Sequence, residues 1–151
     1  MSEPPLPSAR RRLLFAKYGP TLITPFYFGF ATHVLAPTSF ARILGPQLHV
    51  PVVNSLWVGS HVGIGVYLYI SKHLRNADVF DRFLFSIYGS AVLNLSTVLV
   101  MSIVRSIFPD SSALRLGVGL SSGAAILFIG RRYVQYIDQI FDAIRIRTIT
   151  R

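Results

Sequence analysis

The sequence contains no cysteine, which excludes disulfides, thiolate metal sites and cysteine nucleophiles. Charge is also scarce: Asp, Glu, Lys and Arg make up 14% of the 151 residues, whereas a soluble globular domain typically has about 25%. Hydrophobic residues make up 52% of the chain. Because so few charges cannot cover the surface of a water-soluble fold, the composition indicates an integral membrane protein.

Acidic residues are the rarest charged group, and none lies inside a long apolar run. The six are Glu3, Asp78, Asp81, Asp110, Asp138 and Asp142. Ion-coupled carriers and pumps usually hold an ionisable group within the membrane. The sequence also shows no Ser/His/Asp arrangement, phosphate-binding loop or carboxylate-rich metal site. We therefore expect no catalytic residue and no metal site, and interpret the chain as a non-enzyme, even if it belongs to an oxidoreductase or ATP synthase complex.

What the sequence does contain is four apolar segments, at residues 20–36, 51–70, 83–104 and 116–130. A helix needs about 20 apolar residues to cross a bilayer, so the middle two are long enough and the outer two are short. In the middle segments the apolar residues occupy every face, as in a helix surrounded by lipid or other helices. The sequence predicts an all-α integral membrane protein with about four transmembrane helices.

The connections between these segments differ in character. Residues 37–50 contain Pro37, Gly45 and Pro46, and cannot form one regular helix. Residues 71–82 are short and charged, and residues 105–113 contain a Pro-Asp-Ser-Ser turn signal. We divide the chain into a basic N-terminal arm (1–19), a four-helix transmembrane domain (20–130), and a C-terminal amphipathic helix and tail (131–151).

The distribution of positive charge predicts the orientation. Twelve of the fifteen Lys and Arg residues lie in the N-terminal arm, the second connection and the C-terminal segment. By the positive-inside rule, both termini and the second connection face the cytosol or the mitochondrial matrix. We interpret Arg10, Arg11, Arg12, Arg131 and Arg132 as contacts for anionic phospholipid headgroups, cardiolipin included. Nucleic acid is not expected, because the basic residues adjoin apolar runs rather than forming a stripe.

The segment after Arg132 has a helical apolar stripe. Its members are Tyr133, Ile137, Ile140, Phe141 and Ile144, with polar residues largely opposite. We expect an amphipathic helix that continues from the fourth apolar segment and lies on the membrane surface or on a partner. The alternative is that it folds back onto the second connection of the same chain.

Two glycine pairs have the spacing of helix-packing motifs. Gly59 and Gly63 lie four residues apart in the second apolar segment, as do Gly119 and Gly123 in the fourth. Each pair leaves a small face that another helix can approach closely. The sequence does not distinguish packing within the chain from packing against another subunit.

Two histidines, His33 and His61, lie inside apolar segments and are the candidate cofactor-binding residues for a haem or a quinone. Their expected depths differ by roughly 10 Å at a 1.5 Å rise per residue, which disfavours both as ligands of one iron. We therefore predict no bound cofactor as the leading interpretation.

The stretch His61-Val62-Gly63-Ile64-Gly65 resembles the His-Trp-Gly-Ile-Gly stretch of the small membrane-anchor subunit of succinate dehydrogenase. The resemblance covers about five residues and implies a quinone- or haem-associated anchor. The family's haem-ligating position corresponds to Gly59 here, and its Asp-Tyr pair near the quinone corresponds to Ile70 and Ser71.

Small size, short connections and glycine faces favour a non-catalytic accessory or anchor subunit of a larger membrane complex. We expect the mitochondrial inner membrane, in a respiratory-chain or ATP synthase assembly, with both termini in the matrix and other membrane subunits as partners. The alternatives are the quinone- or haem-associated anchor and a small transporter or channel.

Overall fold

The structure is a computed structural model that describes residues 23–149, with side chains described for residues 23–146. The described chain is all-α: a helix over residues 23–35 is followed by α2 (Pro37–Tyr69), α3 (Val79–Ile107) and α4 (Ser112–Ile149). The all-helical prediction is confirmed. Within the described residues, α3 and the 112–146 part of α4 are long and apolar enough to cross a membrane.

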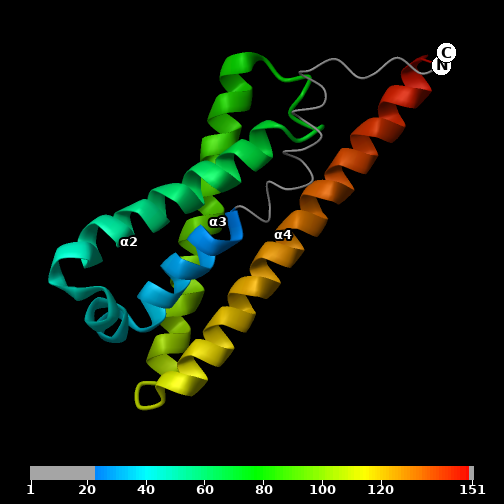
Figure 1. The fold of residues 1–151 in the computed structure, drawn as a ribbon. Helices are drawn as coiled ribbons and strands as arrows, with labels where there is room; N and C mark the ends of the chain where they lie inside the picture. The colour runs from blue at the N-terminus through cyan, green and yellow to red at the C-terminus, as the bar shows by residue number, and fades with distance from the viewer. Residues whose placement is uncertain (1–22, 150–151) are drawn as a thin grey trace, which may run out of the picture.

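The 23–35 helix is the most deeply buried element of the described chain. Ile23, Tyr27, Ala31 and Leu35 recur every fourth residue and form one buried stripe, with Leu35 completely inaccessible. Figure 1 shows this helix, in blue, between α2 and α4. Its stripe joins two core clusters, one with Ile64 of α2 and the other with Met101 of α3.

A sharp change of direction divides α2 at Gly45, whose φ of +75° and ψ of 168° are non-helical. Glycine adopts this positive φ without the steric penalty that a Cβ would impose. Pro37 and Pro46 each lie at the start of a helical arm, where a missing N–H removes no helix hydrogen bond. The prediction that residues 37–50 cannot form one regular helix is confirmed, although both sides of the kink are helical.

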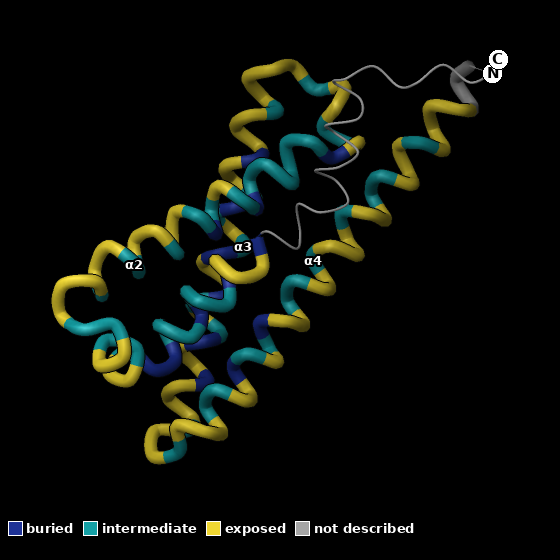
Figure 2. The backbone as a smooth tube through the Cα atoms, viewed as in Figure 1, coloured by how far each residue is buried: buried dark blue, intermediate teal, exposed yellow. Residues whose placement is uncertain are grey.

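The faces of α3 have the reverse of the polarity found in water-soluble proteins. Its buried residues are Ser86, Ser90, Asn94, Thr97, Met101 and Val104. Its exposed residues include Phe83, Leu84, Ile87, Leu95, Leu99 and Ile103. A surface helix in water turns its apolar stripe inward and its polar face outward. Figure 2 shows the exposed residues, in yellow, continuing along α3 and α4.

The last helix, α4, continues without interruption through Arg131 and Arg132. Its 38 residues correspond to about 57 Å at 1.5 Å per residue, nearly twice the roughly 30 Å hydrocarbon thickness of a bilayer. Residues 131–149 are therefore a helical extension of the apolar part of α4 and not a separate element.

Candidate functional site

A set of hydrogen bonds from buried polar side chains, to one another and to backbone carbonyls, joins α2 to α3. The Ser60 hydroxyl donates to Asn94 Oδ1 at 2.6 Å, and Asn94 Nδ2 donates to the Ser90 carbonyl at 2.9 Å. The Ser90 hydroxyl in turn donates to the backbone carbonyl of His61 at 2.7 Å. Since Ser60, Ser90 and Asn94 are all buried and bonded across or along the two helices, this polar seam positions α2 against α3.

A second buried contact ties three helices together through Tyr27. Its hydroxyl lies 2.9 Å from Thr97 Oγ1 of α3 and donates to the Gly123 carbonyl of α4 at 3.3 Å. The side chain is 1% exposed. A buried tyrosine hydroxyl needs a hydrogen-bond partner, and here both neighbouring helices supply one.

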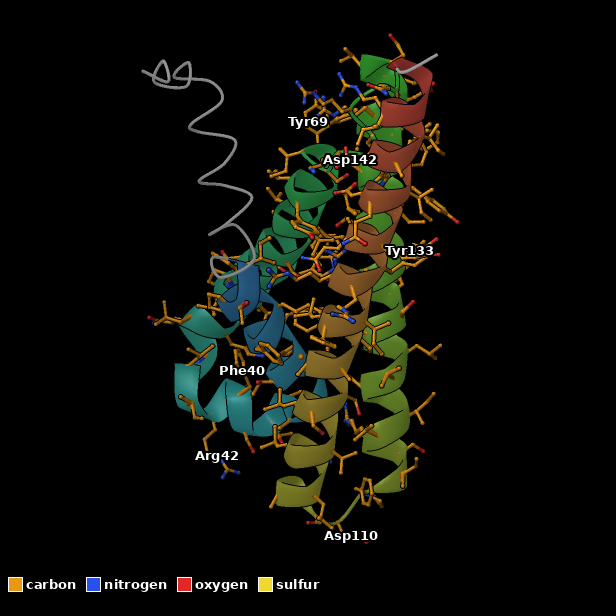
Figure 3. The ribbon with its side chains drawn as sticks, turned by 90° about the vertical axis from the view of Figure 1, so that its right-hand side faces the viewer. Phe40, Arg42, Tyr69, Asp110, Tyr133 and Asp142 are labelled. Carbon is orange, nitrogen blue, oxygen red and sulfur yellow. The ribbon has the colours of Figure 1, made fainter. Side chains whose placement is uncertain are left out.

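The second connection is attached to the extension of α4 by two carboxylates one helical turn apart. Lys72 Nζ lies 2.6 Å from Asp142 Oδ2, and both the ring Nδ1 and the backbone N–H of His73 donate to Asp138 Oδ1, at 2.7 and 2.8 Å. Figure 3 shows Asp142 at the same end of the molecule as Tyr69 and at the opposite end from Asp110. The polar face of the C-terminal helix therefore contacts the chain's own second connection, which was the alternative to lipid or partner contact.

The ion pair between Lys72 and Asp142 also shifts the pKa of Lys72. The hydrogen bond and the negative charge of Asp142 raise the pKa of Lys72 above its ordinary value. Both side chains are substantially exposed, so solvent screens their attraction and the pair adds little stability. The His73–Asp138 contact is about four-fifths buried and defines the geometry of the attachment.

The two candidate cofactor histidines have different neighbours. The His33 ring centroid lies 5.2 Å from that of His49 and 5.4 Å from that of Phe40. The His61 ring lies against Trp57, 4.7 Å between centroids, and its Nδ1 contacts the Trp57 carbonyl at 3.0 Å. The structure thus pairs His33 with His49 rather than with His61.

The His33–His49 pair does not have the geometry of a bis-histidine haem site. With metal–nitrogen bonds of about 2 Å, two rings on opposite sides of one iron would have centroids about 6 Å apart, farther than the 5.2 Å observed. His33 Nδ1 and His49 Nε2 are nevertheless buried with no hydrogen-bond partner among the described residues.

The four helix-packing glycines all face other helices of the same chain. A Cβ added at Gly59 would overlap Phe26, and one at Gly63 would lie 2.5 Å from Ile23. A Cβ at Gly119 would lie 2.5 Å from Leu35, and one at Gly123 would lie 2.9 Å from Met101. The Cβ at Gly123 would also lie against Tyr27, at 3.4 Å, so all four glycines face side chains of the 23–35 helix, which lies between the two small-residue faces.

The candidate lipid-contacting arginines are only partly described. Arg10, Arg11 and Arg12 lie outside the described residues. Arg131 and Arg132 are exposed on adjacent faces of α4, and the Arg132 guanidinium lies 5.9 Å from the Phe128 ring centroid.

Three contacts were missed by reasoning from the sequence: Asp138 with His73, Asp142 with Lys72, and Tyr27 with Thr97. The two aspartates lie four residues apart, as two groups on one helix face must, but this spacing does not identify their partner. No protein-family model, curated protein or solved structure matches the chain.

Proposed function

We propose that the chain crosses the membrane four times, with the N-terminal arm, second connection and C-terminal segment on one basic side. The reversed polarity of α3 supports this proposal most directly. Its apolar face is exposed while Ser86, Ser90, Asn94 and Thr97 are buried. Hydrocarbon is a favourable surrounding for the exposed apolar face, and hydrogen bonds within α3 and to neighbouring helices satisfy the polar groups.

The attachment between Lys72, His73 and α4 supports the same topology. It places the second connection beside Asp138 and Asp142, beyond the apolar part of α4. The turn containing Asp110 lies at the other end of α3 and α4 (Figure 3). The second connection and the Asp110 turn would therefore lie on opposite sides of the membrane. This agrees with the excess of Lys and Arg in the second connection over the third.

Within this topology the protein acts as a non-catalytic accessory or anchor subunit of a larger membrane complex. The observation that carries this proposal is an uncovered small-residue face on α4. A Cβ at Gly117 would meet nothing within 4 Å, and Ser121 and Ala125, one and two turns further on, are exposed. Small residues at this spacing allow another transmembrane helix to approach closely. Gly119 and Gly123, on a different face, are already occupied internally.

The mitochondrial inner membrane is the location that we propose, with both termini in the matrix. Support comes from composition alone: a chain of 151 residues with a net charge of +9 and short connections resembles supernumerary subunits of respiratory complexes and ATP synthase.

The experiment is native electrophoresis in mild detergent, with mass spectrometry of the co-migrating proteins. The wild-type chain is expected in a particle much larger than its own 16.8 kDa. Gly117→Leu, which adds bulk to the uncovered face, should release it, whereas Ser102→Leu, an exposed small residue on α3, should not. Migration of the wild type as an isolated monomer across several mild detergents would contradict the proposed role.

A further inference from the structure

Two adjoining cavities separate α4 from α2 and α3 near the basic end of the molecule. The smaller has a volume of about 220 Å³ and is lined by residues that include Tyr67, Leu127 and Arg131. The larger, about 590 Å³, lies between α3 and α4 and is lined by residues that include Tyr88 and Tyr133. Leu68, Leu93, Gly130 and Val134 line both cavities. These four residues therefore form the boundary that the two spaces share.

The lining of both cavities is overwhelmingly apolar. An apolar cavity does not hold ordered water, because water there would lack hydrogen-bond partners. An empty one leaves the surrounding side chains without van der Waals contacts on one side. The larger volume lies within the range of small-molecule sites. In a bilayer, the apolar molecules that surround α3 and α4 are acyl chains.

One fixed positive charge borders this apolar space. Arg131 lines the smaller cavity, and no carboxylate of the described residues lines either cavity. Asp138, the first acidic residue of α4 after Arg131, is already bonded to His73. Among the described residues the recorded ion pairs involve Lys72 and His73, not Arg131. A guanidinium presents paired N–H donors that match the oxygens of a phosphate.

We propose that these cavities bind an anionic glycerophospholipid of the bilayer, with an acyl chain in the apolar space and the phosphate against Arg131. An apolar slot bordered by Arg131, which forms no ion pair with residues 23–146, matches a molecule with one apolar end and one anionic end. The proposal rests on the membrane location but not on the accessory role, since the site is formed by one chain.

The test is native mass spectrometry of the purified full-length chain in dodecylmaltoside micelles containing phosphatidylglycerol or phosphatidylcholine. Wild-type protein is expected to retain phosphatidylglycerol in preference to phosphatidylcholine. Arg131→Gln should weaken phosphatidylglycerol retention about fivefold, the effect of one basic residue beside an anionic lipid. Arg145→Gln is the matched control, since it removes the same charge from an exposed position of α4 outside both cavity linings.

A second pair of variants tests the acyl-chain space. Val134 lines both cavities, so Val134→Trp should fill the space where they adjoin and abolish retention of both lipids. Leu99→Trp adds a tryptophan on the exposed face of α3 and should not change retention. Helical circular dichroism would establish that each variant is folded, and the arginine pair remains decisive if Val134→Trp fails to fold. Equal effects of Arg131→Gln and Arg145→Gln, or complete loss of phospholipid from the wild type, would overturn the proposal.

Discussion

At the scale of single residues, several buried polar groups of α3 form hydrogen bonds to neighbouring helices. Asn94 is 2% exposed and Ser60 is fully inaccessible, so each must find its hydrogen-bond partner inside the protein. The Ser60 hydroxyl donates to the Asn94 side-chain oxygen, and the Ser90 hydroxyl donates to the His61 carbonyl. Ser60, Ser90 and Asn94 therefore each have a hydrogen-bond partner within the described residues.

Replacing Asn94 by Leu should destabilise the protein by about 1 to 2 kcal/mol, because the Ser60 hydroxyl loses its acceptor in a buried position. The measurement is reversible unfolding in mixed micelles, followed by circular dichroism. Ser96→Ala is the control: the Ser96 hydroxyl is exposed and bonds only the Val92 carbonyl of its own helix. Similar effects of the two substitutions would show that the buried seam has no special role.

The Lys72–Asp142 pair predicts a pH dependence at its own end of the molecule. Because Asp142 raises the pKa of Lys72 in the folded protein, the contribution of this pair is complete below the unfolded pKa, near 10.5. It is lost as the pH rises through the higher folded pKa. Spin labels on Arg75→Cys and Gln139→Cys should report a distance distribution that broadens only at strongly alkaline pH.

The chain has no native cysteine to interfere with this labelling. Asp142→Asn removes the negative charge and should remove the alkaline transition. If the alkaline transition kept its midpoint in Asp142→Asn, the titration of another group would be its cause.

At the scale of helices, the 23–35 helix organises the molecule because two small-residue faces surround it. Ile23 and Phe26 lie on the glycines of α2, while Tyr27 and Leu35 lie on those of α4. Close approach of this kind replaces the hydrophobic driving force, which does not act between helices in lipid. The first apolar segment looked marginal by length, yet it supplies the central packing surface.

Gly63→Leu should therefore destabilise the fold by about 1 to 3 kcal/mol, the usual cost of overpacking a close contact. The added side chain would have to displace Ile23, which lies 2.5 Å from where the first carbon would be placed. Gly117→Leu is the matched control for the isolated chain, since it projects into open space. If thermal unfolding in detergent showed equal losses for both variants, the glycines would not be acting through packing.

At the scale of the whole molecule, the sequence predicted the elements better than their contacts. Uninterrupted apolar runs identified the helices, and the Pro/Gly cluster predicted that residues 37–50 are not one regular helix, because both depend on local chemistry. The contact of His73 with Asp138 joins residues 65 apart, and no local period encodes it. His49 lies beside His33 only because α2 turns back at Gly45, which sequence spacing alone could not reveal.

The whole account depends on α3 lying in a bilayer with its apolar face toward lipid. Its most direct test is accessibility of single cysteines, at Arg75, Leu95, Leu99 and Asp110, to a membrane-impermeant thiol reagent in sealed vesicles. We predict that Arg75→Cys and Asp110→Cys react from opposite sides and that Leu95→Cys and Leu99→Cys stay unreactive until the bilayer is dissolved and the protein unfolded. Rapid labelling of Leu95→Cys and Leu99→Cys in intact vesicles, or of Arg75→Cys and Asp110→Cys from the same side, would contradict it.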